Sequence, residues 1–201
     1  MSNEVDLSGL EFRPLTVQHW SDFEELFGPR GACGGCWCMW WRLKRSEFDR
    51  QKGEGNRQAM KAIVESGEIP GLLAYLDGVP VAWCSVAPRK QFGVLQRSPV
   101  LKPIDETPVW SVVCFFVAKP FRKRGLTSQL LLAAVEYVKQ QGGTVVEGYP
   151  VEPSKDHIPD VFAYTGLAST FRKAGFVEAL RRSETRPIMR LHIEGETAAN
   201  D

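Results

Sequence analysis

Hydrophobic and polar positions along the first third of the chain follow two different periods. Glu11 to Leu15 is typical of a short strand, and the apolar residues after it recur at helical spacing. We expect Thr16 to cap that helix, because a Thr side chain accepts well from the first free N–H groups. A second helix is predicted from Asn56 to Ser66, with Gly67 as its end. The chain therefore opens with a strand and two helices.

The middle of the chain predicts a β-hairpin and a long buried strand. Leu72 to Leu76 and Val79 to Val86 flank Asp77-Gly78, a dipeptide that tolerates the positive φ values of a type I′ turn. Val109 to Val117 reads VWSVVCFFV, which is almost continuously apolar and rich in β-branched and aromatic residues. Such a run predicts a central strand that is covered on both faces.

A long helix and a group of short elements complete the pattern. Apolar residues recur at helical spacing from Arg122 to Gln141, and Gly142-Gly143 ends this helix. The expected remainder is a strand, a short helix and a strand pair, at Thr144 to Gly148, Gly166 to Lys173, Phe176 to Arg182 and Pro187 to Ile193. We therefore predict one mixed α/β domain over residues 10–193, with tails at 1–9 and 194–201 that hold few large apolar side chains.

Composition excludes several classes of protein. With 43% hydrophobic and 24% charged residues, the 201-residue chain is neither collagen-like, nor a coiled coil, nor wholly disordered. Lys and Arg number 25 against 24 Asp and Glu, so a net charge of +1 gives no field that would attract nucleic acid or an anionic membrane. We find neither a secretory signal pattern nor an apolar run of about 18 residues, so we expect a cytoplasmic protein.

A basic turn stands between the central strand and the long helix. Its cationic residues are Lys119, Arg122, Lys123 and Arg124. The first turn of a helix leaves several N–H groups without partners and has a partial positive charge, so it attracts phosphate. Gly125 lets a diphosphate approach the backbone, and Thr127 and Ser128 add hydroxyl donors. The alternative is a solvated basic loop in which Gly125 serves only the turn.

The basic turn resembles a known motif. Arg122 to Thr127 reads RKRGLT and is similar to the [RQ]-x-x-G-x-[GA] motif that Gcn5-related N-acetyltransferases (GNAT) have after a central strand, with Thr127 in place of the usual small residue. The order of elements over residues 10–193 is also similar. The resemblance implies the GNAT acyl-CoA transferase fold, in which a mixed central sheet has two splayed parallel strands and flanking helices. It also implies transfer of acetyl from acetyl-CoA to an amine, by direct attack in a ternary complex.

The same resemblance implies where acetyl-CoA binds. The cosubstrate would lie in a cleft between Val109 to Val117 and Thr144 to Gly148. Main-chain groups of three residues would pair with the pantetheine arm, namely Phe115, Phe116 and Val117. The diphosphate would be held at the basic turn, by Arg122, Lys123, Arg124, Gly125, Leu126, Thr127 and Ser128.

The catalytic residues depart from the family pattern. Many members have a glutamate base on the central strand, where this chain has no carboxylate, and a terminal tyrosine, where this chain has Phe171. We expect Glu147 to be the general base, because period-two alternation points it into the cleft. The alternative is that Glu147 only pairs with a basic side chain. Tyr164 is the expected proton donor to the leaving thiolate. Cys114 is an alternative nucleophile, although a cysteine in an apolar strand is usually a core residue.

The segment from Gly31 to Arg42, GACGGCWCMWWR, holds three of the five cysteines and three of the six tryptophans. A Cys3His zinc site would need Cys33, Cys36 and Cys38 together with His19 or His157. Because a second C-x-x-C motif does not occur, we predict reduced thiols and no metal.

By resemblance, the same segment borders the acceptor cleft through Trp37, Trp40, Trp41 and Arg42. These side chains suit an acceptor with a flat or apolar body, a cation over aromatic rings, or an anion paired with Arg42. The rival interpretation is a non-catalytic CoA-binding module, or a metal or redox sensor built on the cysteines. The sequence leaves open whether the acceptor is a small molecule or a peptide, and whether the chain forms a homodimer.

Overall fold

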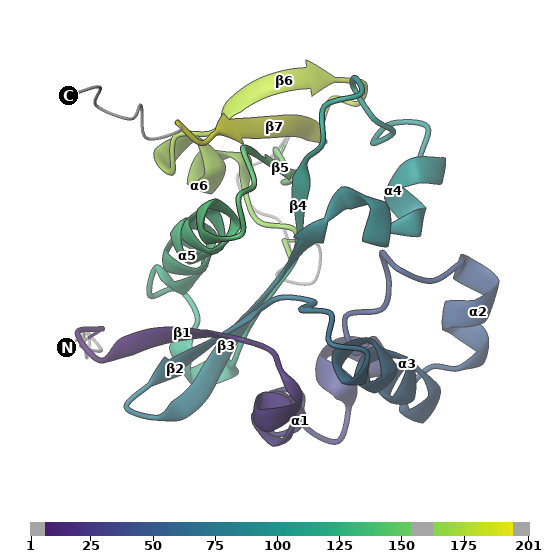
Figure 1. The fold of residues 1–201 in the computed structure, drawn as a ribbon, viewed down its shortest axis with the longest axis vertical. Helices are drawn as coiled ribbons and strands as arrows, with labels where there is room; N and C mark the ends of the chain where they lie inside the picture. The colour runs from purple at the N-terminus through teal and green to yellow at the C-terminus, as the bar shows by residue number, and fades with distance from the viewer. Residues whose placement is uncertain (1–6, 154–162, 195–201) are drawn as a thin grey trace.

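The computed structural model describes residues 7–153 and 163–194, which form a seven-stranded mixed sheet with helices on both faces (Figure 1). The strand order is β1-β2-β3-β4-β5-β7-β6. The strands are β1 (Leu10–Pro14), β2 (Leu72–Leu76), β3 (Val79–Pro88), β4 (Trp110–Val117), β5 (Val145–Gly148), β6 (Val177–Arg181) and β7 (Pro187–His192). Strands β4 and β5 pair in parallel, and the other neighbouring strands are antiparallel.

The helices lie in the segments that connect the strands of the sheet. They are α1 (Trp20–Phe27), α2 (Arg45–Arg50), α3 (Glu54–Glu65), α4 (Gly93–Arg97), α5 (Leu126–Gln140) and α6 (Ala168–Lys173). Short helical turns are η1 (Val17–His19), η2 (Gly31–Gly35), η3 (Arg89–Gln91) and η4 (Lys119–Phe121). No helix within the described residues is long and apolar enough to cross a membrane.

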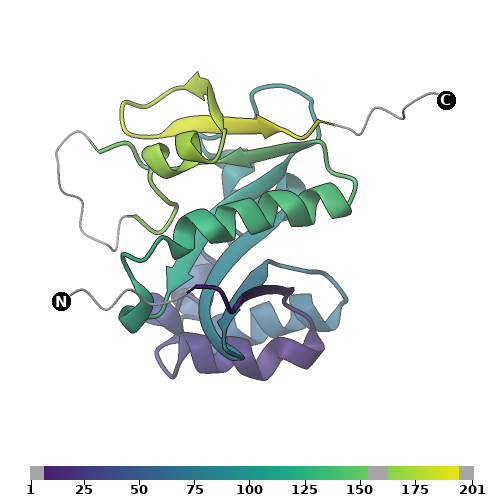
Figure 2. The same cartoon turned by 90° about the vertical axis from the view of Figure 1, so that its left-hand side faces the viewer.

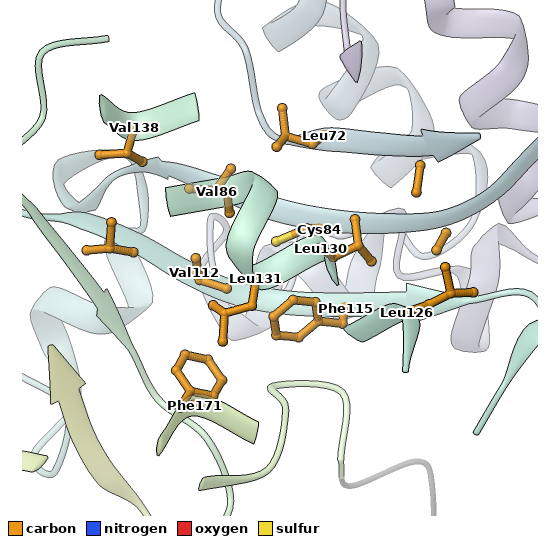
Figure 3. Close-up of a cluster of buried hydrophobic side chains, with 14 of the residues drawn as sticks. Leu72, Cys84, Val86, Val112, Phe115, Leu126, Leu130, Leu131, Val138 and Phe171 are labelled. Carbon is orange, nitrogen blue, oxygen red and sulfur yellow. The ribbon is translucent and has the colours of Figure 1, made fainter. Parts of the chain in front are cut away.

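Helix α5 covers one face of the sheet with its apolar side chains. Figure 2 shows it lying across the strands, and Figure 3 shows Leu130 and Leu131 packed toward Val112 and Phe115 of β4. Removing such side chains from water is the main stabilising term of a domain of this size. The N-terminal end of α5 is thereby fixed next to the end of β4.

The opposite face is covered by an aromatic cluster. Phe23 and Phe27 of α1 pack against Trp83 of β3, with ring centroids 4.9 and 6.2 Å away. Trp37 stacks on Phe27 at 5.7 Å and 18° between planes. The two layers bury β4 on both faces, as the sequence predicted.

The order of strands and helices that the sequence predicted is confirmed. At the hairpin, Asp77 has φ 51° and Gly78 has φ 80°, as a type I′ turn requires. Helices α2 and α4 were not predicted, because each has only a single buried apolar side chain within its short length.

The start of α5 and the capping of the first helix differ from the sequence prediction. Helix α5 begins at Leu126 rather than Arg122, because Lys123 and Gly125 adopt positive φ values of 61° and 80°. Thr16 precedes η1, makes no capping hydrogen bond, and instead contacts Nδ1 of His19 at 3.2 Å.

Candidate active site

Strands β4 and β5 separate soon after they begin to pair. In this parallel pair, Trp110 lies opposite Val146, Ser111 opposite Glu147, and Val112 opposite Gly148. Residues 113–117 of β4 continue beside β3 without β5. Within the described residues, one edge of β4 therefore has no paired strand from residue 113 onward, although helices still cover both faces of the strand (Figure 1).

A β-bulge marks the point of separation. Ser85 pairs with Cys114 and Val86 with Val112, so Val113 is the extra residue of β4. Val113 and Cys114 consequently both face the layer of α1 and α4, whereas Val112 and Phe115 face α5. The bulge turns the Cys114 thiol away from the α5 core.

The open edge of β4 presents main-chain groups of Phe115 and Val117. The Phe115 N–H donates to the Tyr164 carbonyl at 2.6 Å, and Arg122 Nε donates to the Val117 carbonyl at 3.0 Å. Phe116 lies opposite Trp83, and strand alternation turns its main chain toward β3. Of the three residues predicted to meet pantetheine, two therefore face the open edge and Phe116 does not.

The basic turn leads into the N-terminus of α5, which has no side-chain capping hydrogen bond within the described residues. Ser128 N–H donates to the Gly125 carbonyl at 3.0 Å, so this amide is already engaged in the helix. A Cβ on Gly125 would meet no atom within 4 Å, so its φ of 80° rather than lack of space requires glycine. An uncapped helix start beside basic residues fits the diphosphate of a nucleotide cosubstrate.

Glu147 lies at the start of the separation and is fully buried. Arg89 Nη1 donates to its Oε1 at 2.6 Å, and Arg190 Nε donates to its Oε2 at 2.7 Å. The Tyr149 hydroxyl also donates to Oε1, at 2.6 Å. The role of Glu147 as general base stays a prediction, and these contacts favour the alternative that Glu147 pairs with basic side chains.

The ion pairs continue beyond Glu147. Arg190 also binds Asp105, with 2.7 Å from Nη1 to Oδ2, and this guanidinium holds the pKa of Asp105 well below its usual range. Arg89 Nη2 donates to the Leu101 carbonyl at 2.6 Å. Burial beside Glu147 raises the pKa of Tyr149, which keeps its hydroxyl protonated. Two carboxylates and two guanidiniums thus balance in charge.

Tyr164 lies beside the open edge of β4. Its carbonyl accepts from Phe115, and its ring centroid is 6.4 Å from that of Trp41. Burial raises the pKa of the Tyr164 hydroxyl to about 12, so it stays protonated throughout the neutral range. The role of Tyr164 as proton donor stays a prediction, which its position beside the open edge suits.

The predicted acceptor residues separate into two groups. Trp37 packs in the α1 core, whereas Trp41 lies next to Tyr164. Trp40 contacts Phe48 edge to face at 5.2 Å. The Arg42 guanidinium lies 4.6 Å from the Phe92 ring centroid, and its Nη1 donates to Gln91 at 3.1 Å. Trp37 and Trp41 therefore lie in different clusters, and Trp40 packs against both.

Two thiols that the sequence analysis named separately, Cys38 and Cys114, pack in the same cluster. Hydrogen bonding with Cys114 lowers the pKa of Cys38 to about 7, and the same bond with burial raises the pKa of Cys114. Trp83 Nε1 donates to Cys38 Sγ at 3.2 Å. Their signal in the sequence was weak, because only the bulge brings Cys114 to this face.

All five cysteines are free thiols. Within the described residues, no group of His, Cys, Asp and Glu is arranged to hold a metal ion, and His157 lies outside those residues.

The comparisons with known proteins agree with this architecture. The structure of a GNAT-family acetyltransferase from Listeria monocytogenes has a TM-score of 0.58 at 9% identity, covering 95% of this chain and 100% of that one. The PaiA N-acetyltransferase of Thermoplasma acidophilum, solved with coenzyme A, has a TM-score of 0.51 at 15% identity, covering 92% and 99%. YncA, a putative acetyltransferase of Salmonella typhimurium solved with acetyl-CoA, has 0.52 at 13%, covering 96% and 99%.

No curated protein sequence matches the chain. The model of the acetyltransferase (GNAT) family matches residues 37–156, which is more than half of the chain and includes the bulge, the open edge and the basic turn. The chain therefore belongs to the GNAT family of acetyl-CoA-dependent acetyltransferases.

Proposed function

We propose that the protein is an N-acetyltransferase in which an amine attacks acetyl-CoA directly, in a ternary complex. The observation that supports this best is the separation of β4 from β5 directly beside an uncapped helix N-terminus. An extended thioester arm can pair with the open strand edge while its diphosphate meets the helix start. The similar folds solved with coenzyme A and acetyl-CoA support acetyl-CoA as the cosubstrate of this chain.

In this proposal, the pantetheine arm pairs with the main chain of Phe115 and Val117. Both positions have hydrogen-bond partners, the Tyr164 carbonyl and the Arg122 side chain. The arm therefore replaces the Tyr164 carbonyl at Phe115, and Arg122 turns toward the diphosphate. The amides of residues 123–127 and the basic side chains hold that diphosphate.

The acceptor amine enters from the side of Trp41 and Tyr164. The Tyr164 hydroxyl stays protonated, so it donates to the thiolate as coenzyme A leaves. Trp40, Trp41 and Arg42 contact the body of the acceptor. Glu147 holds β5 to β7 and η3 through its ion pairs, which keeps the separation of the strands in place.

Gly125→Val tests the cosubstrate site. A branched residue is strained at the φ of 80°, so the turn must change its path and its amides move away from the diphosphate. We expect the affinity for acetyl-CoA to fall by about 1–3 kcal/mol, which is roughly 5- to 150-fold, by isothermal titration calorimetry.

Gly142→Val is the matched control. It has a φ of 74°, lies just after the other end of α5, and a Cβ there also meets nothing within 4 Å. It carries a similar strain but should bind acetyl-CoA normally. Equal affinities of the two folded variants would contradict the site.

Release of coenzyme A with a panel of amines tests the activity itself. Small amines and short peptides with free N-termini cover both classes of acceptor. Acetyl-CoA binding without acceptor-dependent release would instead favour a CoA-binding module without catalysis.

A further inference from the structure

A thiol pair lies between β4 and the segment that follows η2. Cys114 is partly exposed, Cys38 is 3% exposed, and both belong to the packed cluster under α1. Trp83 Nε1 of β3 donates to the Cys38 sulfur at 3.2 Å. An N–H donated to a buried sulfur stabilises its anion.

The charge around the pair favours the thiolate of Cys38. Among the described residues no carboxylate pairs with Arg42, whose positive charge lowers the pKa of Cys38 while Cys38 raises that of Arg42. Burial lowers the Arg42 pKa to about 10, which still leaves it cationic. Donors and cation together hold the pKa of Cys38 at about 7, well below its usual value.

The other titratable groups near the pair are neutral in this pH range. Burial raises the pKa of Cys36, of Cys84 on the α5 side, and of the Tyr164 hydroxyl. Glu68 acts on Arg42 only at a distance. Cys38 is therefore the group of this cluster that changes charge near neutral pH.

We propose that Cys114 and Cys38 together accept the proton of the acceptor amine, in place of the carboxylate that β4 lacks. This inference rests on the proposed function, since it needs the thioester to lie along the open edge next to Cys114. Cys114 contacts the amine and is the catalytic residue. Cys38 acts through Cys114, and Arg42 positions the charge.

The proton transfer balances as follows. The ammonium of the acceptor gives one proton to the Cys114 sulfur, and Cys114 passes its own proton to the Cys38 thiolate. The neutral amine forms the C–N bond, the C–S bond breaks, and coenzyme A leaves as a thiolate. The second proton of the nitrogen goes to that thiolate through Tyr164, and Cys38 later releases its proton to solvent.

The geometry disfavours an acetyl-cysteine intermediate. Cys38 has thiolate character but is buried, and Cys114 is partly exposed but keeps its proton because its pKa is raised. A proton relay instead uses Cys114 as a thiol and Cys38 as a thiolate.

The test compares pH profiles of kcat/KM. In the wild type, kcat/KM should rise through about pH 7 as Cys38 becomes a thiolate. Cys38→Ser and Cys114→Ala should each lose roughly 10²- to 10⁴-fold at neutral pH, and the rise should move to the higher pH at which the acceptor itself deprotonates. Cys114→Ser keeps a hydroxyl that can pass a proton, so it should retain more activity than Cys114→Ala.

Two controls separate this effect from loss of packing or of a thiol. Cys33→Ser removes an exposed thiol of the same segment, and Cys84→Ala removes a buried sulfur from the α5 side. Both should keep the wild-type profile. If Cys38→Ser and Cys114→Ala also keep their rate and profile, the relay is wrong while the acetyltransferase function stands.

A second measurement does not depend on activity. The thiolate absorbance of the wild type minus that of Cys38→Ser should show one thiol that titrates near pH 7. No such difference would overturn the relay even if the amine panel found no acceptor. An acetyl group trapped on Cys114, detected by peptide mass after exposure to acetyl-CoA alone, would replace the relay with covalent catalysis.

Discussion

Two buried polar clusters lie along β4, one on each side of the bulge. The Glu147 cluster comprises Glu147, Arg89, Arg190, Tyr149 and Asp105, and it lies where β4 still pairs with β5. The thiol cluster comprises Cys38, Cys114, Trp83, Ser85 and Arg42, and it lies where β5 has left. The same strand thus holds a charge-balanced cluster before the bulge and a cluster without a carboxylate after it.

The two clusters differ in how far the acidic group of each is already paired with cations. Both oxygens of Glu147 accept from guanidiniums, so this carboxylate is already paired within the fold. The pKa of Cys38 is lowered to about 7, mainly by hydrogen bonding with Cys114, so this thiol can exchange a proton near neutral pH. We infer that a buried acid with two arginines stabilises the fold, whereas a buried thiol beside an open edge is available for chemistry.

Glu147→Gln should give the largest effect, and it acts on stability. The substitution leaves Arg89 without an anion in a buried position, since Arg190 keeps Asp105. Breaking a buried ion pair from one side costs about 3–5 kcal/mol. Urea denaturation should show this loss in the free energy of unfolding.

Glu178→Gln is the control on the surface. Glu178 pairs with Arg181 in a partly exposed ion pair, so the expected loss is only about 0–1 kcal/mol. A stable Glu147→Gln protein that loses about a hundredfold in kcat/KM would restore Glu147 as the general base.

The Glu147 cluster shows how far the sequence could predict a site. The late strand position of Glu147 was evident, and pairing with a basic side chain was one of two alternatives. Arg89 and Arg190 come from η3 and β7, and only the sheet register places Arg190 opposite Glu147. A single sequence gives alternation within a strand but not the neighbours across it.

The basic turn was predictable for a different reason. Its residues are contiguous, and a helix start attracts phosphate wherever it lies. The thiol cluster needs residues from three separate segments and a bulge at Val113, for which no local residue type is diagnostic. A site made of contiguous residues can therefore be predicted from the sequence, whereas a site assembled from side chains of separate strands cannot.

A pH dependence of stability should sharpen the comparison. The folded pKa of Cys38 is lowered from 9.0 to about 7, so between these values the unfolded chain holds a proton that the folded chain has lost. The free energy of unfolding should therefore rise with pH across this window, by about 2–3 kcal/mol in all. Cys114 and Cys84 have raised pKa values, so stability should fall again above about pH 9.

Cys38→Ser should remove the rise between pH 7 and 9 and leave the later fall. The measurement is a series of urea denaturations at fixed ionic strength, in reducing buffer. Identical slopes for the wild type and Cys38→Ser would show that Cys38 is not a thiolate in the folded protein.

The smallest expected effect separates the tryptophans at the acceptor side from those of the core. Trp41 lies 6.4 Å from Tyr164 between ring centroids, and its indole Nε1 is buried without a partner among the described residues. Trp41→Phe therefore loses aromatic contact with the acceptor but no internal hydrogen bond. We expect the acceptor KM to rise roughly fivefold, which corresponds to a loss of about 1 kcal/mol of binding free energy, with the KM for acetyl-CoA unchanged. Trp37→Phe alters the stack on Phe27 instead, so it should lower stability and leave the acceptor KM unchanged. An equal rise in acceptor KM in both variants would place the acceptor against the stack of Trp37 and Phe27 as well as against Trp41.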